Sequence, residues 1–253
     1  WNANVSYVDH ILDHVNGVLF AGGILDDVGP TSLQYFHRVQ YILNRTRAVY
    51  WGGEAQDPGF VIWGTCQGFE MLAAAAAGTL DALASGLVGV DPAMLPLTPI
   101  PKSSFGNPAR DRMFANMTAA ELGVVTTHDV TLHWHSKGVL PETFHRETTA
   151  FPLLADLLEP LTQNADANGT IFVSAYQGRR HGTRVFATQF HPERPPFEFD
   201  NDVIQHTPEA LGLSQYLSLQ LRWWLSQSTH RFPNASNANS LIIENYQAVN
   251  QGW

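Results

Sequence analysis

Residues 60–78, FVIWGTCQGFEMLAAAAAG, join a short β-prone run to a helix-forming run through a turn that contains a cysteine. Residues 60–63 are β-branched or aromatic, which favours a short buried strand. Residues 71–77 are all strong helix formers, and Gly78 stands where a left-handed helix C-cap would fall. The order predicts a strand that passes into a helix through residues 64–68.

The turn carries Cys66, the chain's only cysteine, between Gly64 and Gly68. A nucleophile elbow has this form, because a side chain raised on a tight strand-to-helix turn needs small neighbours. Free N–H groups and the positive dipole end at the start of the helix are expected to favour the thiolate. A lone cysteine is ordinarily a small buried apolar residue. The flanking glycines and the strand-to-helix change favour a nucleophile here.

Composition sets the broad class of the protein. With 253 residues and 44% hydrophobic content, the chain can bury a substantial core. No segment reaches the roughly 18 apolar residues that span a bilayer, so we expect no membrane partner. The net charge of −9 argues against a nucleic-acid partner. Protonation of the eleven histidines would more than cancel this charge, so acidic surroundings would change the electrostatics greatly.

Five N-x-S/T sequons predict a glycoprotein of the secretory pathway. Because one cysteine excludes an internal disulfide, no disulfide can indicate the redox compartment, and the sequons are the only indication of it. The sequon asparagines are Asn4, Asn44, Asn116, Asn168 and Asn234.

The rest of the chain alternates strand and helix patterns. A short amphipathic helix is expected within residues 2–16, a strand at 18–21 and a helix from Pro30 through residue 43. Further strands are expected at 87–90, 130–135, 171–176 and 185–190, with Asn168-Gly169 as a hairpin tip. Residues 118–123 suit one helical turn, 151–161 are ambiguous, and 234–240 form a polar loop. Thr207 and Pro208 open a long helix. This order is typical of a parallel α/β sheet.

A thiol nucleophile needs a base, and the base needs an orienting group. Residues 189–193, QFHPE, offer both. Residues two apart on an extended chain project to the same side, so the Glu193 carboxylate can approach the His191 ring. Any of the eleven histidines could serve as the base on sequence pattern alone, and a histidine near an acid is usually a surface pair.

Three stretches together resemble the class I glutamine amidotransferase-like superfamily, and within it the γ-glutamyl hydrolases, which are cysteine peptidases. They are NGVLFAGG at 16–23, WGTCQGFE at 63–70 and TQFHPE at 188–193. Looser similarity covers HWHS at 133–136 and LIIENYQAV at 241–249. The resemblance implies one glutamine amidotransferase-like hydrolase domain over residues 1–253, built as a three-layer sandwich around a parallel sheet.

The resemblance also implies the roles of the site residues. Cys66 would be the nucleophile, His191 the general base and acid, and Glu193 the group that orients His191. Backbone N–H groups of Gly23 and Gln67 would form the oxyanion hole. The positions that would contact substrate are Glu70, His133 and Gly22.

Two of these positions have other interpretations. Glu70 equally suits a capping or core-edge carboxylate. His133 and His135 could pair as metal ligands by strand spacing, but two ligands are too few for a site. We therefore expect no metal and no cofactor.

The implied reaction is acyl transfer through a thioester, with folyl-poly-γ-glutamate as the small-molecule substrate and the lysosome, the vacuole or the extracellular space as its location. Such a substrate is polyanionic, so cations are needed nearby. Arg179, Arg180 and Arg184 are the candidates, although basic residues beside a hairpin are more often simply solvated.

The sequence departs from the family at its start. Family members have a strand-helix-strand unit before the stretch at 16–23, and this sequence lacks it. Without that unit we expect an uncovered sheet edge. Two partner chains stay open, a second copy in a homodimer and a separate N-terminal fragment that completes the sheet.

Other functions compete with hydrolysis of folyl-poly-γ-glutamate. A glutaminase subunit of a class I amidotransferase would use the same residues, but sequons argue against it. An α/β-hydrolase would place the acid before the histidine, whereas Glu193 follows His191. An inactive glycosylated binding protein on the same fold would be expected to have a broken triad, and all three residues are present.

Overall fold

The computed structural model describes residues 4–23, 29–51, 59–180, 182–242 and 245. Its helices are α1 Val5–Leu12, α2 Pro30–Val49, α3 Gln67–Ala77, α4 Ala119–Thr127, α5 Pro152–Leu157, α6 Pro208–Leu225 and α7 Ala235–Asn239, with short 3-10 turns at Leu80–Ala82 and Pro141–Phe144. Its strands are β1 Gly17–Phe20, β2 Val61–Thr65, β3 Ala84–Ser85, β4 Ala93–Leu95, β5 Thr98–Pro99, β6 Thr131–His133, β7 Lys137–Gly138, β8 Leu158–Ala165, β9 Ile171–Gly178 and β10 Val185–Thr188.

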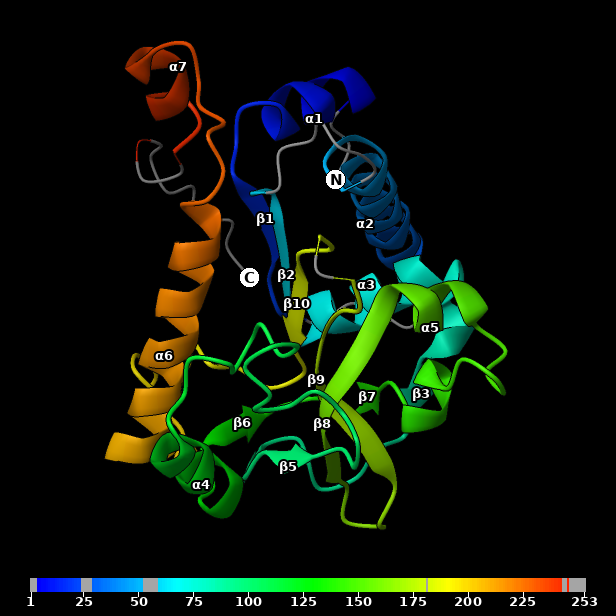
Figure 1. Ribbon diagram of the computed structural model, residues 1–253, viewed down its shortest axis with the longest axis vertical. Coiled ribbons are helices and arrows are strands. Elements are labelled where there is room, and N and C mark those ends of the chain that lie inside the picture. The colour runs from blue at the N-terminus through cyan, green and yellow to red at the C-terminus, as the bar shows by residue number, and fades with distance from the viewer. Residues whose placement is uncertain (1–3, 24–28, 52–58, 181, 243–244, 246–253) are drawn as a thin grey trace.

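A six-stranded sheet in the order β1-β2-β10-β9-β8-β5 forms the centre of the molecule (Figure 1). The strands β1, β2 and β10 are parallel, as the sequence predicts. The strands β9, β8 and β5 are antiparallel, so the sheet is mixed rather than parallel throughout. The tight turn at Asn168-Gly169 accounts for the antiparallel pairing of β8 with β9, because a short hairpin can join only antiparallel strands.

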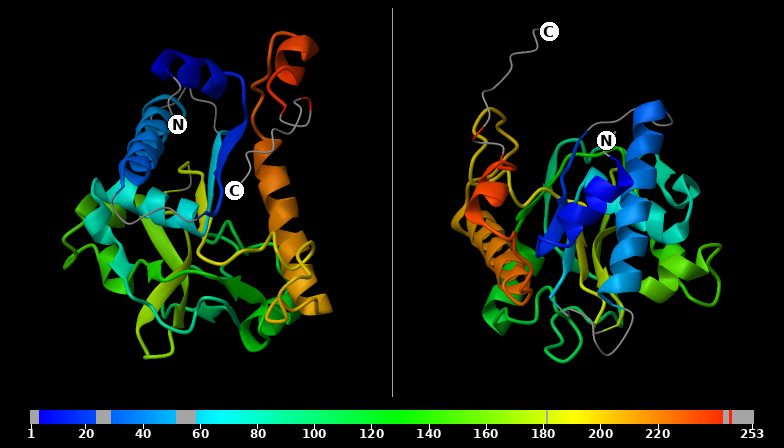
Figure 2. Two further views of the ribbon diagram at one scale, coloured as in Figure 1. Left: turned by 180° about the vertical axis from the view of Figure 1, so that it is seen from behind. Right: turned by 90° about the horizontal axis from the view of Figure 1, so that it is seen from above.

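Helices cover both faces of the parallel part of the sheet, which confirms the three-layer architecture. One core packs α2 and α3 against the sheet through Val39, Leu43 and Leu72. The other packs α6 against the opposite face through Leu213 and Leu217. Figures 1 and 2 show α2 and α6 on opposite sides of the strands.

Strand β2 contributes to both cores because its side chains alternate between the two faces. Ile62 belongs to the α2–α3 core, whereas Val61 and Trp63 belong to the α6 core. Every residue of β2 is buried, which is why the stretch reads as a continuous apolar run instead of an alternating one.

The turn from β2 into α3 is the elbow that the sequence predicts. Cys66 has φ of 51°, a left-handed conformation that few non-glycine residues adopt. Gly68 allows a close approach, because a Cβ there would collide with the carbonyl oxygen of Phe20. A Cβ on Gly64 would lie 2.7 Å from the carbonyl oxygen of Gly68. The glycines are therefore a packing requirement of the turn.

Several sequence-based boundaries differ from the structure. No strand forms at 87–90; the nearby strand is β3, at Ala84–Ser85. The expected single turn at 118–123 extends into α4, whose start is fixed by a capping box between Thr118 and Glu121. The ambiguous stretch 151–161 divides into α5 and the beginning of β8. Asn234 caps a short helix, α7, within the predicted polar loop.

The strand β1 lies at the edge of the described sheet, next to β2. Its Leu19 side chain is 54% exposed. Most of the C-terminal stretch 241–249, which carried part of the family resemblance, lies outside the described residues. Among the helices that the structure describes, none combines the length and the apolar character needed to cross a membrane.

Candidate active site

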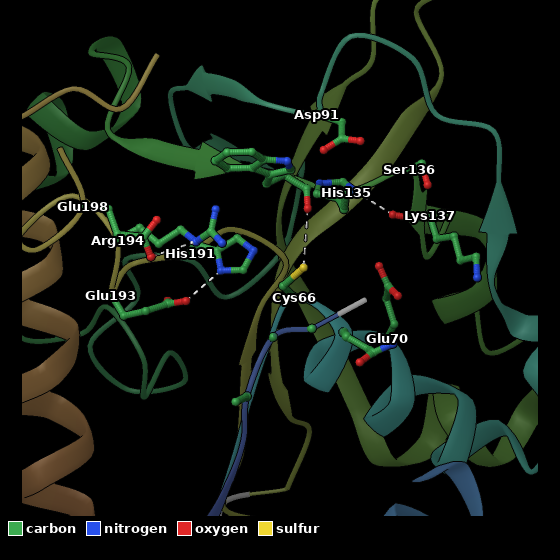
Figure 3. Close-up of a pocket in the computed structure, with 15 residues that line it drawn as sticks. Cys66, Glu70, Asp91, His135, Ser136, Lys137, His191, Glu193, Arg194 and Glu198 are labelled. Carbon is green, nitrogen blue, oxygen red and sulfur yellow. Dashed lines mark hydrogen bonds and ion pairs between the residues drawn. The ribbon is translucent and has the colours of Figure 1, made fainter. Parts of the chain in front are cut away.

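A cavity of about 700 Å³ opens where the three parallel strands end (Figure 3). The segment after β1 supplies Gly22 and Gly23, the elbow after β2 supplies Cys66, and the segment after β10 supplies His191. Carboxyl ends of adjacent parallel strands meet at one sheet edge, which is where α/β proteins bind ligands. The lining residues are Ala21, Gly22, Gly23, Cys66, Gln67, Glu70, Asp91, Trp134, His135, Ser136, Lys137, His191, Glu193, Arg194 and Glu198.

The Cys66 thiol is held inside the cavity wall and is only 4% exposed. Its Sγ donates a hydrogen bond to the carbonyl oxygen of Trp134 over 3.8 Å. Burial, followed by the negative charge of Glu70, raises the pKa of Cys66 to about 12, and the Gln67 backbone N–H opposes this shift. The start of the helix therefore acts in the expected direction, toward the thiolate, but in the free enzyme desolvation outweighs it.

The His191 ring is buried beside the thiol and is oriented by Glu193. His191 Nδ1 lies 2.7 Å from Glu193 Oε1. A carboxylate can only accept, so Nδ1 carries the hydrogen and Nε2 is left as the basic nitrogen. A Cβ built on Gly22 would lie 2.7 Å from His191 Cε1 and 3.3 Å from Cys66 Cβ. Gly22 thus lies against both residues, and its lack of a side chain lets them share the cavity.

The segment of Gly23 and the first turn of α3 meet beside the thiol. A Cβ on Gly23 would be 3.0 Å from Gln67 Oε1, so the two residues are neighbours across the cavity wall. The Gln67 backbone N–H interacts with the Cys66 sulfur. Backbone N–H groups at the start of a helix suit an anion. The oxyanion hole expected at Gly23 and Gln67 stays a prediction, and the closeness of the two residues to each other and to the thiol is compatible with it.

Glu70 places a buried carboxylate one helical turn beyond Cys66. It is buried yet lines the cavity, and its Oε1 accepts a hydrogen bond from Gln189 Nε2 at 3.0 Å. The position fits the predicted substrate contact and also a core-edge carboxylate. Gln189 lies two residues before His191, so this hydrogen bond ties α3 to the segment that carries the base.

His133 does not line the cavity, so the direct substrate contact predicted for it does not fit its position. Its side chain is fully buried, and its Nδ1 lies 2.9 Å from Nε2 of His135, which does line the cavity. His135 Nδ1 donates to the carbonyl oxygen of Lys137 at 2.6 Å. Burial lowers the pKa of His135 to about 4 and that of His133 well below its usual value. The pair is therefore neutral, and His133 holds the His135 ring through this hydrogen bond from the side away from the cavity.

The cations predicted near the substrate are elsewhere. Arg179 donates to the carbonyl oxygens of Ala155 and Leu158, and Arg184 stacks on Trp224. Arg180 is also absent from the lining of this cavity. Lys137 and Arg194 line it instead. Each directly follows a stretch that carried the resemblance, HWHS or HPE, and this adjacency could have identified both from the sequence.

All five sequon asparagines have exposed side chains in the structure. Asn4 and Asn234 cap the first turns of α1 and α7, and Asn168 lies at the tip of the β8–β9 hairpin. Asn116 differs from the others in that its Nδ2, the atom that would carry a glycan, donates a hydrogen bond to Gln220 Oε1 at 3.2 Å.

Comparisons with known proteins agree with this geometry. The chain is 28% identical over 244 residues to the γ-glutamyl hydrolase of Homo sapiens, covering 94% of the chain and 68% of that relative. It is 25% identical over 248 residues to γ-glutamyl hydrolase B of Dictyostelium discoideum, covering 97% and 66%. It is 28% identical over 253 residues to γ-glutamyl hydrolase 1 of Arabidopsis thaliana, covering 96% and 63%.

The chain thus spans about two thirds of the length of these curated relatives. They confirm the resemblance to γ-glutamyl hydrolases that the motifs predict. A family profile described as peptidase C26 matches residues 1–193, a stretch that includes Cys66, His191 and Glu193. Because that match covers well over half of the sequence, the chain belongs to the peptidase C26 family.

Proposed function

We propose that this protein is a cysteine-type hydrolase of γ-glutamyl bonds and that folyl-poly-γ-glutamates are its substrates. The observation that carries the proposal is the meeting of the Cys66 thiol with a His191 ring that Glu193 orients, at one cavity. The relatives named γ-glutamyl hydrolase support the choice of bond.

The first step couples proton transfer to attack. Since burial keeps Cys66 a thiol, His191 Nε2 takes its proton as the sulfur attacks the γ-carbonyl carbon. The carbonyl π electrons move to oxygen, and the N–H groups of Gly23 and Gln67 donate hydrogen bonds to the resulting oxyanion. Glu193 stabilises the imidazolium that forms.

The second step releases the amine, and the third restores the enzyme. The carbon–nitrogen bond breaks as His191 gives its proton to the leaving nitrogen, which leaves a thioester on Cys66. Water then attacks the thioester carbon while His191 Nε2 takes a proton from it. The carbon–sulfur bond breaks, and the sulfur recovers the proton from His191. One amide and one water become one carboxylic acid and one amine.

We further propose that the protein acts in the secretory pathway, in a lysosome or vacuole or after secretion. The exposure of all five sequon asparagines supports this location. Glycan removal with an endoglycosidase, followed by mass measurement of the natively expressed protein, tests it. An unchanged mass would contradict it.

Product analysis by mass spectrometry tests the activity itself. The full-length protein is incubated with folyl-penta-γ-glutamate, and in parallel with free glutamine. Shortened folates with released glutamate or glutamate peptides are expected. Ammonia from glutamine beside an intact folate tail would instead indicate a glutaminase, and no turnover of either compound would indicate a binding protein.

A further inference from the structure

Two cations line the cavity on opposite sides of Cys66. Figure 3 shows Arg194 on the side of His191 and Glu193, and Lys137 on the side of Glu70 and Ser136. The other charged groups of the lining are carboxylates, namely Glu70, Asp91, Glu193 and Glu198. A polyanionic substrate must therefore place its carboxylates with some precision, and the two cations are the attractive points.

We propose that Arg194 binds the α-carboxylate of the glutamate that leaves, and that this contact makes glutamate the preferred leaving group. The proposal rests on the proposed function and deepens it by assigning a specificity residue to one side of the scissile bond.

The surroundings of Arg194 hold its guanidinium in place. It stacks on the Trp134 ring at 4.5 Å, and its Nε lies 3.3 Å from Glu198 Oε1. Stacking occupies the face of the guanidinium and leaves the N–H groups along its edge for hydrogen bonds. The side chain is 27% exposed, so it is fixed by contacts but still reachable from the cavity.

One nitrogen of this guanidinium has an unmet hydrogen-bonding need. Arg194 Nη1 is buried and has no hydrogen-bond partner among the described residues. An unsatisfied buried donor is costly, and a charged one more so. A carboxylate from a ligand would satisfy it and would form the short, charge-assisted bond that arginine makes best. Because that nitrogen is buried, the bond requires the side chain to move toward the ligand.

The side of the cavity follows from the reaction. His191 gives its proton to the leaving nitrogen, so the leaving residue lies on the His191 side of Cys66. Arg194 is three residues after His191 in the same segment. In the leaving glutamate a single carbon, Cα, separates that nitrogen from the α-carboxylate. The α-carboxylate is thus the anionic group nearest to Arg194. Lys137 lies on the other side of Cys66, where the acyl half of the substrate would be placed (Figure 3).

The chemistry of the substrate favours the α-carboxylate over the side-chain carboxylate. In a γ-linked chain every leaving residue keeps its α-carboxylate. The side-chain carboxylate is free only on the last residue, because elsewhere it forms the next amide. A contact to the α-carboxylate therefore serves internal and terminal bonds alike.

The test compares three substrates that differ only in the leaving residue: pteroyl-glutamyl-γ-glutamate, pteroyl-glutamyl-γ-isoglutamine, which lacks the α-carboxylate, and pteroyl-glutamyl-γ-glutamine, which lacks the side-chain carboxylate. We expect wild type to favour the glutamate compound over the isoglutamine compound by about tenfold or more in kcat/KM, and over the glutamine compound by less than about threefold. Arg194→Met is expected to remove most of the first preference by lowering kcat/KM for the glutamate and glutamine compounds, which both keep the α-carboxylate, and not for the isoglutamine compound.

Three further variants separate this contact from other effects. Arg194→Lys keeps the charge near Cys66 but loses the planar fork, so it should lose part of the preference. Lys137→Met should lower kcat/KM for all three compounds alike, since it lies on the side where the acyl half would be placed. Arg146→Met removes an exposed cation paired with Asp156 outside the cavity lining and should leave every value unchanged.

The outcomes are distinct. If Arg194→Met lowers kcat/KM equally for the glutamate and isoglutamine compounds, Arg194 acts on Cys66 or on the fold, and the assignment is overturned. A preference that depends on the side-chain carboxylate would also overturn it. Wild type that cleaves all three compounds equally well contradicts this assignment but leaves the proposed function intact, whereas wild type that cleaves none contradicts the proposed function.

Discussion

The Cys66 thiol donates its hydrogen to the carbonyl oxygen of Trp134, 3.8 Å away, in a wall of the cavity where burial and Glu70 raise its pKa to about 12. The nucleophile therefore rests as a thiol and depends on a base at the moment of attack. Many cysteine enzymes instead stabilise a thiolate in advance.

Removing the charge of Glu70 should make Cys66 more reactive. Glu70→Gln eliminates the largest charge-based cause of the raised pKa, so we expect alkylation of Cys66 by iodoacetamide at pH 8 to quicken by several-fold, up to about tenfold per pKa unit. Since Cys66 is the only cysteine, the reaction reports on it alone. Glu142→Gln, an exposed acid, is the control. Alkylation that stays the same or slows in Glu70→Gln would contradict the electrostatic account.

Glu193 orients and stabilises the His191 ring without exchanging a proton with substrate. Its side chain is 52% exposed, so solvent screens its charge. We expect Glu193→Gln to lower kcat by roughly 10- to 100-fold, and His191→Ala by about 1000-fold or more. Steady-state kinetics on pteroyl-glutamyl-γ-glutamate measure both. Equal losses would mean that Glu193 takes part in the proton transfer itself.

The missing side chain of Gly22 is required for the base to approach the thiol. A Cβ at this position would lie 2.7 Å from His191 Cε1, so Gly22→Ala should displace the ring and lower kcat by roughly 100-fold with little change in melting temperature. Gly123→Ala is the matched control, because a Cβ there meets open space on α4 and should slightly stabilise that helix. Full activity in Gly22→Ala would show that the His191 ring can move away from residue 22 without loss of catalysis.

The buried histidines should make the fold less stable in acid. His135 has a folded pKa of about 4 and an ordinary unfolded value near 6.5, so the unfolded chain binds more protons in this window. The contribution of neutral His135 to the free energy of unfolding is complete above about pH 6.5. As the pH falls toward 4, this contribution decreases by about 3 kcal/mol. Urea unfolding across this range should show a smaller fall in His135→Asn than in wild type or in His128→Asn, an exposed control. Parallel curves of unfolding free energy against pH for all three proteins would contradict this role of His135.

Local sequence chemistry predicts the elbow and the base well. Gly64, Gly68 and Gly78 each stand where a close approach or a left-handed backbone requires them, and the two-residue spacing brings Glu193 onto His191. These features depend on neighbours in the chain, which a sequence displays directly.

Features that depend on distant packing could not be predicted. The raised pKa of Cys66 results from burial and from the Glu70 carboxylate, and a sequence motif does not show how deeply its residues are buried. The shared motif predicts a substrate contact for His133, yet its strand directs the side chain into the core. The pairing of β5 with β8 joins residues 98–99 to residues 162–163, which are far apart in the sequence.

The most direct test of the central claim is the turnover of pteroyl-glutamyl-γ-glutamate by Cys66→Ala, measured by mass spectrometry beside wild type. Alanine and cysteine tolerate the left-handed backbone at position 66 about equally, so the circular dichroism spectrum and melting temperature should match those of wild type. We predict that wild type releases glutamate and that a folded Cys66→Ala releases none above the uncatalysed rate. Release of glutamate by Cys66→Ala at a rate near that of wild type would contradict a thioester mechanism on this cysteine.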